Sequence, residues 1–171
     1  MKASPKGKIV STLVSTIASM LVLASQAVHS DEPTPVVHLR ALAPHIAHQM
    51  VFSAVEDCTK RGYKVSAAVV DRNGNLAAFL RNPLSGPHTI KVSQRKAFTS
   101  ATLQAATSQV TERPDLNFAP DILLIVGGVP INFGGNFYGG VAVAGASDVE
   151  VDEKCAKAGI DAVADIMEFA D

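Results

Sequence analysis

The chain has 171 residues, of which 47% are hydrophobic and 18% charged, and its 15 basic and 16 acidic side chains leave a formal net charge of −1. This composition fits one compact globular domain and excludes a disordered or collagen-like chain. The charge is near neutral and no run of five or more Lys and Arg residues occurs, so we expect no nucleic-acid partner.

Residues 1–30 have the pattern of an export signal. Lys side chains precede an apolar run over 9–24, and small residues then stand where a signal peptidase cleaves, after Ala27 or after Ser30. An uncleaved membrane anchor is the alternative, but the run is short for the roughly 20 residues that span a bilayer. We therefore expect a periplasmic or secreted protein that has no membrane contact once the signal is removed.

The sequence holds two cysteines, Cys58 and Cys155. In an oxidising compartment, a pair without a third Cys favours one intramolecular disulfide over a metal site, which would need further ligands nearby. This bridge would tie the first helix of the domain to the last. Two separate buried thiols are the alternative, because free Cys is a common core residue.

A leader and one domain follow the signal. Residues 31–38 are broken by Pro and are expected to be poorly ordered, and residues 39–171 are expected to form a single domain. Apolar residues recur at helical spacing over 39–60, which predicts an amphipathic helix that ends at Gly62.

A β-hairpin is predicted next. Two apolar segments over 65–70 and 76–80 are rich in strand-forming residues. They flank Asn73-Gly74, a dipeptide that tolerates positive φ at both central positions of a tight turn.

The second half is predicted to alternate between helices and an antiparallel meander. The expected elements are a helix over 89–106, a helical turn over 107–113, strands over 121–126, 129–133 and 137–145, and a closing helix over 148–169. The element order is then α-β-β-α-β-β-β-α. This order predicts an α/β domain of the α+β type, with a central antiparallel five-stranded sheet flanked by helices.

The common catalytic signatures are absent. The sequence contains no G-x-S-x-G elbow, no phosphate-binding P-loop, no H-E-x-x-H motif and no C-x-x-C-H haem-attachment motif. Three glycine pairs occur between 127 and 140, but a dinucleotide loop leads from a strand into a helix, and these pairs lie between and within strands. Gly139-Gly140 therefore marks either a bulge or a close approach of a ligand or a neighbouring backbone.

Histidines are the candidate metal ligands. His45 and His48 are three residues apart and share one helix face, a geometry that suits a metal or a flat cofactor, although solvent-facing side chains are the simpler alternative. His88 lies in a Gly-Pro-His-Thr loop before the second helix and is the preferred ligand. Lys91 and Arg95 follow on the same helix and could pair with carboxylates.

Five segments resemble the successive motifs of the GlcG/HbpS-like haem-binding family. They lie in the family's order at 65–76, 95–101, 127–131, 140–146 and 152–159. The resemblance covers nearly all of the expected domain. It implies an antiparallel sheet flanked by helices, a tendency to form homo-oligomers, and functions that differ more between members than the fold does.

On this resemblance, the leading hypothesis is an exported protein that binds haem noncovalently, in haem and iron handling or redox sensing. His88 would be the iron ligand, with His45 and His48 as the other candidates. Lys91 and Arg95 would meet the propionates. The apolar walls are expected from Phe98, Phe79 or Phe118.

Two alternatives come from other functional classes. One is an enzyme or carrier for a glycolate-type acid, for which Asp71 with Arg95 or His88 is the only acid/base set that the sequence offers. The other is a structural or interaction module without a ligand.

Overall fold

The computed structural model describes residues 35–170, and the chain from Leu39 onward forms one compact unit. The expected signal over 1–30 lies outside the described residues. Residues 35–38, the described part of the leader, form no helix or strand. Within the described part of the chain, no helix is both long and apolar enough to cross a membrane.

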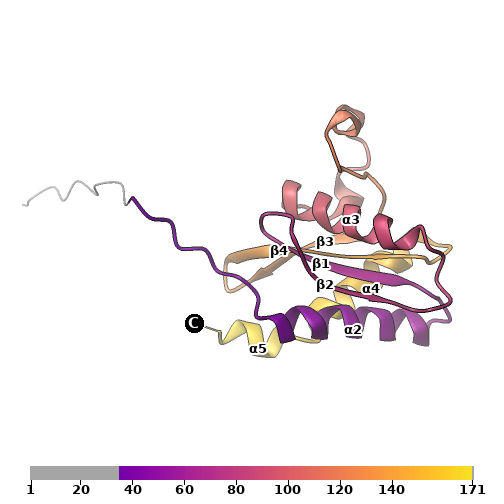
Figure 1. Ribbon diagram of the computed structural model, residues 1–171, viewed down its shortest axis with the longest axis horizontal. Helices are drawn as coiled ribbons and strands as arrows, with labels where there is room; N and C mark the ends of the chain where they lie inside the picture. The colour runs from indigo at the N-terminus through magenta and orange to yellow at the C-terminus, as the bar shows by residue number, and fades with distance from the viewer. Residues whose placement is uncertain (1–34, 171) are drawn as a thin grey trace, which may run out of the picture. The chain divides into compact units, whose positions relative to one another are not determined.

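The sheet has four antiparallel strands in the order β2-β1-β4-β3. They span β1 Ser66–Asp71, β2 Leu76–Arg81, β3 Gly128–Phe133 and β4 Asn136–Ala144. The predicted hairpin is confirmed, because β1 pairs with β2 across a turn in which Gly74 has φ +83°. The hairpin joins the rest of the sheet through the pairing of β1 with β4 (Figure 1).

The prediction of a fifth strand over 121–126 is wrong. Here the backbone runs along the second helix of the domain, whose side chains take the place of a neighbouring strand. Arg95 Nη2 donates to the Ile122 carbonyl at 2.8 Å, and the Leu123 amide donates to Thr99 Oγ1 at 2.8 Å. Asp121, with φ +61°, turns the chain at the start of the segment. Of residues 121–126 only Ile122 is buried, and Ile125 is 40% exposed, so the apolar run packs along α3 without belonging to the sheet.

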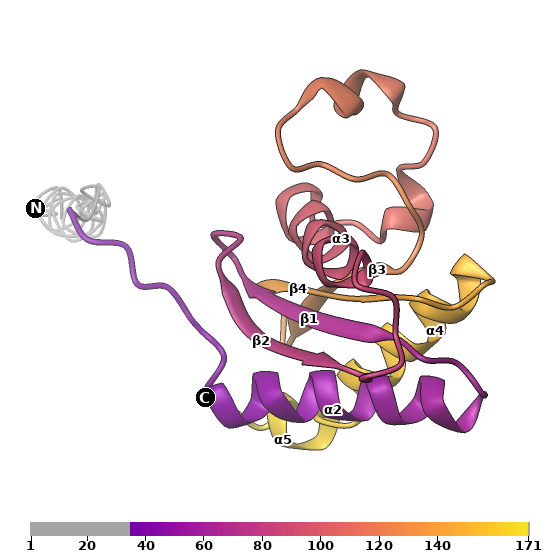
Figure 2. The same cartoon turned by 45° about the vertical axis from the view of Figure 1, so that its right-hand side comes forward.

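Three main helices cover the sheet, α2 Pro44–Lys60, α3 Thr89–Leu103 and α4 Val149–Asp161. Helices α2 and α4 lie together on one face, and α3 lies on the other (Figure 2). Two short 3₁₀ helices, η1 Thr107–Gln109 and η2 Pro114–Phe118, lie between α3 and β3.

The helix ends differ from the predictions. Helix α2 begins at Pro44 rather than at residue 39, since Pro fits the first turn of a helix, where its missing N–H is not needed. The closing helix is divided into α4 and a short α5, Ala164–Glu168. At the division, Val163 leaves the helical conformation (φ −122°, ψ 3°) while its side chain remains buried.

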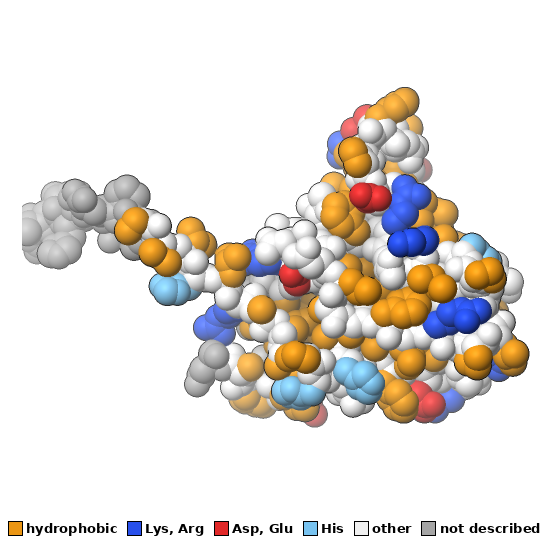
Figure 3. All heavy atoms as spheres, viewed as in Figure 1, with side chains coloured by type: hydrophobic (Ala, Val, Ile, Leu, Met, Phe, Trp, Pro, Cys, Tyr) orange, Lys and Arg blue, Asp and Glu red, His pale blue; other side chains and the backbone are white. Residues whose placement is uncertain are grey.

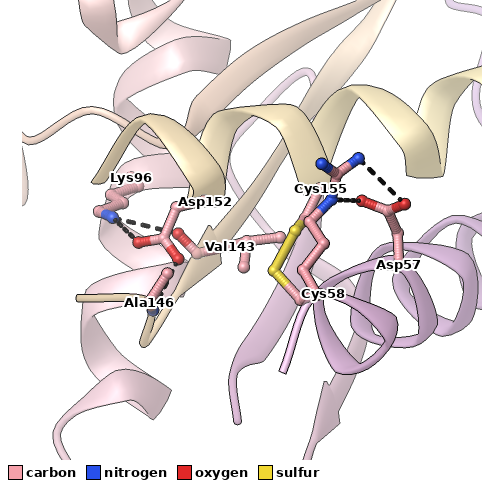
Figure 4. The surroundings of a disulfide bond; sticks show 8 residues. Asp57, Cys58, Lys96, Val143, Ala146, Asp152 and Cys155 are labelled. Atoms are coloured by element: carbon pink, nitrogen blue, oxygen red, sulfur yellow. Dashed lines mark hydrogen bonds and ion pairs between the residues drawn. A yellow bond between two sulfur atoms is a disulfide. The ribbon is translucent and has the colours of Figure 1, made fainter. Parts of the chain in front are cut away.

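The predicted disulfide is confirmed. Cys58 on α2 and Cys155 on α4 are fully buried and bonded, with 5.5 Å between their Cα atoms. Figure 4 shows the bond joining the two helices that share one face of the sheet.

The Gly139-Gly140 pair in β4 is explained by close backbone packing. A Cβ on Gly140 would lie 2.4 Å from the Ala97 carbonyl oxygen of α3, and a Cβ on Gly139 would lie 2.1 Å from the Val70 carbonyl oxygen of β1. The ladder between β3 and β4 is also irregular beside Gly139. Both positions therefore admit a neighbouring backbone, which accounts for the pair without a ligand.

Candidate functional site

The three candidate histidines lie in two separate parts of the domain. His45 and His48 are exposed on α2, whereas His88 is exposed at the residue before α3. Because α2 and α3 cover opposite faces of the sheet, the predicted site residues do not form one cluster.

His45 lines a cavity of about 330 Å³ beside the beginning of α2. We call it the α2 cavity. Its wall is mainly apolar and also carries one guanidinium and one phenol; it consists of Arg40, Ala41, Leu42, Ala43, His45, Ile46, Tyr138, Ile166, Met167 and Ala170. The cavity is therefore formed by the first turn of α2, the start of β4 and the region of α5.

The local sequence explains why the edge of the α2 cavity is polar. Pro44 starts α2, and Ala43 at the N-cap offers no side-chain acceptor to the first amides. The positive end of the helix dipole thus faces the region that also holds His45 and Arg40. Arg40 Nη1 donates to the Ala170 carbonyl at 3.4 Å, which joins the two sides of the cavity.

His48 and His88 have different surroundings. The His48 ring stacks on Phe52, with 6.4 Å between the ring centroids, on the exposed side of α2. The His88 ring lies against Gly86, where an added Cβ would be 2.7 Å from the ring carbon Cε1. Neither side chain lines the α2 cavity, whereas His45 does.

Lys91, Arg95 and Phe98 line a second cavity of about 410 Å³ between α3 and the β1–β2 hairpin. We call it the α3 cleft. Its other lining residues are Val70, Gly74, Leu76, Gln94 and Asp121. Gly74 allows the hairpin turn to meet Phe98, because a Cβ there would lie 2.5 Å from the ring. His88 is not part of this lining.

Of the other predicted walls, Phe79 is half-buried and packs on the α3 side of the sheet. Phe118 is 91% exposed on η2 and lines neither the α2 cavity nor the α3 cleft.

Asp71 is engaged in the hairpin turn. Its carboxylate accepts hydrogen bonds from the amides of Asn73 and Asn75 at 2.8 and 2.9 Å and from Asn75 Nδ2 at 3.0 Å. Burial raises the pKa of Asp71, but the hydrogen bonds from Asn75, Asn73 and Gly74 outweigh it, so the pKa is below its usual value. A carboxylate stabilised in this way is a weak base, and no hydrogen bond joins it to Arg95 or His88 in the described chain.

A buried ion pair is the feature that the sequence analysis missed. Lys96 Nζ lies 2.8 Å from Asp152 Oδ2, and both side chains are only 2% exposed. Lys96 also donates to the Val143 carbonyl at 3.1 Å, and Asp152 Oδ1 accepts from the Ala146 amide at 3.0 Å (Figure 4). Burial lowers the pKa of Lys96 and raises the pKa of Asp152, and the opposite charge of each opposes the shift of the other.

The positions of neighbouring small residues in α3 indicate that the Lys96 side chain points inward. Lys96 lies three residues after Ser93 and four before Ser100, and both serines are buried. The position therefore belongs to the inner face of the helix. A Lys in such a stripe requires a buried partner.

The described residues contain no group of three or more His, Cys, Asp and Glu side chains that could hold a metal ion by themselves. An iron ion would need other ligands besides His45, His48 or His88.

Comparison with known proteins identifies the class to which this fold belongs. The family described as "Haem degrading protein HbpS-like" matches residues 42–161. A crystal structure of a double mutant of Streptomyces reticuli HbpS is similar, with 36% sequence identity and a TM-score of 0.72 over 76% of this chain and 92% of that one. The chain belongs to the HbpS-like family, as the sequence motifs predicted.

Two curated proteins are also similar to this chain. The Escherichia coli protein GlcG is 31% identical over 107 residues, which cover 60% of this chain and 80% of GlcG. Corrinoid adenosyltransferase PduO of Salmonella typhimurium is 26% identical over 160 residues, 88% of this chain, but the match spans only 46% of that protein. A structure described as a PduOC–haem complex shares the fold at 23% identity, with a TM-score of 0.66 over 72% of this chain and 95% of that one.

Proposed function

We propose that this protein binds haem noncovalently in the α2 cavity, with His45 as the protein ligand of the iron. The observation that carries the proposal is the position of His45 at a mainly apolar recess that also holds a guanidinium. The family description and the PduOC–haem complex support haem as the ligand class.

The residues present fit this cofactor. A haem needs apolar side chains against its macrocycle, a cation near its propionates and a donor atom for the iron. Leu42, Ile46 and Met167 supply the apolar contacts, Arg40 supplies the cation, and the His45 imidazole supplies the donor.

The bound haem would supply an iron centre that changes oxidation state and takes small ligands. The chain's own residues would exclude water from one edge of the macrocycle and fix its orientation. Arg40 and the uncapped start of α2 both favour negative charge at the mouth of the cavity. We expect the propionates to lie there.

The export pattern of residues 1–30 supports a periplasmic or secreted location, and the disulfide suits an oxidising compartment. In that setting the proposed role is haem and iron handling or redox sensing outside the cytoplasm.

A haemin titration of the mature protein tests the proposal, with His45→Ala, His48→Ala and His88→Ala compared at matched concentration. All three histidines are exposed, so the variants should fold alike. We expect a saturable Soret shift at one haem per chain that is lost in His45→Ala and kept in the other two. Arg40→Gln should weaken haem binding roughly fivefold, as expected for one exposed charge pair.

Other outcomes assign the site elsewhere. Loss of the shift only in His88→Ala would move the iron to the start of α3 and contradict the α2 cavity. A folded wild-type protein without a saturable shift would overturn haem binding itself.

A further inference from the structure

A projecting segment lies between α3 and β3. Residues 108–121, which we call the arm, extend away from α3 in both Figure 1 and Figure 2. None of these residues is buried, and Phe118 is 91% exposed. Figure 3 shows hydrophobic and charged side chains together at the outer end of the arm.

The arm is held in place at both of its roots. At one end, Thr107 Oγ1 accepts from the Gly128 amide at 2.9 Å, and at the other Arg95 Nη2 donates to the Ile122 carbonyl at 2.8 Å. Within the arm, Arg113 and Asp115 form an ion pair of 2.8 Å. The phenyl ring is thus presented on a structured support, and aromatic side chains are enriched at protein–protein interfaces.

The α3 cleft complements the arm in its apolar surface. Val70, Leu76 and Phe98 line the cleft, and Leu76 remains 52% exposed. The volume of about 410 Å³ leaves room for an aromatic side chain. Rings that enter such recesses are the usual anchors of protein interfaces.

The charges are complementary as well. Lys91 lines the cleft, and its ammonium group makes no hydrogen bond or ion pair within residues 35–170. The side chain of Glu112, six residues before Phe118 in the sequence of the arm, likewise makes no hydrogen bond or ion pair in the described chain, whereas the charge of Asp115 is balanced by Arg113. An arm that approached a cleft would therefore bring opposite charges together around the inserted ring.

We propose that Phe118 of one copy inserts into the α3 cleft of a second copy. The arm and the cleft both adjoin α3, so a two-fold axis beside this helix can make the two insertions reciprocal. The interface requires no haem and uses a different cavity from the proposed haem site. It identifies the contact surface of a homo-oligomer, a state that the family resemblance implied without naming residues.

Disulfide trapping between copies tests this contact in haem-free protein. The native cysteines are buried and bonded to each other, so a single introduced Cys is the only free thiol. Phe118→Cys and Leu76→Cys variants that carry different tags are mixed and oxidised. We expect a heterodimer linked between residues 118 and 76. Linkage only between two Phe118→Cys chains, or no linkage, would overturn the insertion into the cleft.

Sedimentation of Phe118→Ser gives an independent measurement. Loss of an anchor residue should weaken self-association by about 30-fold or more. Phe169→Ser is the matched control, because Phe169 is also a highly exposed phenylalanine, 84% exposed, and lies after α5. A monomeric wild type, or equal weakening by both substitutions, would contradict the proposed interface.

Discussion

The two faces of the sheet are packed by different means. The face under α2 and α4 is filled by large apolar side chains such as Met50, Val51 and Ile131 and is joined by the disulfide. The face under α3 has a small core of alanines with Val70, and Phe79 and Phe137 pack at its margin.

The difference teaches how a close-packed helix compensates for limited apolar burial. Small residues let the α3 backbone approach the strands, as the 2.4 Å distance from a Cβ on Gly140 to the Ala97 oxygen shows. Less apolar surface is then available to stabilise this face. Polar links replace it. Thr89 Oγ1 lies 2.7 Å from Ser66 Oγ and 2.9 Å from Ser85 Oγ, and Lys96 of α3 pairs with Asp152 at the start of α4, which covers the other face.

Removal of the disulfide should have the largest effect on stability and would test the α2–α4 face. The Cys58→Ala, Cys155→Ala double variant opens a loop with a sequence separation of 97 residues. The chain-entropy account predicts a loss of about 4 to 5 kcal/mol in the free energy of unfolding. Urea unfolding measures this loss. A decrease below about 1 kcal/mol would show that apolar packing alone secures this face.

Breaking the ion pair should cost nearly as much on the α3 face. Lys96→Met leaves Asp152 as a buried charge without its partner, and such changes cost about 3 to 5 kcal/mol. Adding Asp152→Leu should restore most of the lost stability, because no charge then remains buried. Lys91→Met, an exposed change on the same helix, serves as the control. If the double variant were as unstable as Lys96→Met, the pair would stabilise the fold mainly through its packing and not through the mutual compensation of its charges.

The smallest effect concerns the hairpin turn beside the α3 cleft. Asp71→Asn should lower the unfolding free energy at pH 7 by up to about 1 kcal/mol, the worth of an ordinary hydrogen bond. The pKa of Asp71 is lowered in the folded state, so its carboxylate stabilises the protein above the unfolded pKa of about 3.9 and stops doing so as the pH falls through the folded pKa. Urea unfolding of both proteins from pH 7 to pH 2 should therefore show their difference shrinking in acid. A constant difference would contradict a role for the charge.

Local patterns predicted most of the fold. Helical spacing, the Asn73-Gly74 turn and the two cysteines gave the first helix, the hairpin and the disulfide, because each depends on nearby residues or on a simple count. The strand predicted over 121–126 failed for a tertiary reason. Its backbone groups bond to Arg95 and Thr99, and no sequence period reveals which partner an apolar segment will take.

The candidate site was predictable only in part. Lys91 and Arg95 are four residues apart, so their spacing placed them on one side of a helix, and both line the α3 cleft, as Phe98 does. The grouping of His45 with residues near the C-terminus depends on how α2 meets the region of α5, which no local pattern encodes. The buried position of Lys96 was missed because a lysine side chain is usually exposed to solvent, and because its partner Asp152 lies 56 residues away in the sequence.

The α2 cavity is walled by the two ends of the domain. Residues 40–46 form one side, and Ile166, Met167 and Ala170 form another, beyond residue 161, where the family match stops. The family match therefore includes His45 and Tyr138 but not the side of the cavity formed by Ile166, Met167 and Ala170. Relatives could exchange the last few residues, and with them the shape of the recess beside His45, without disturbing a single strand.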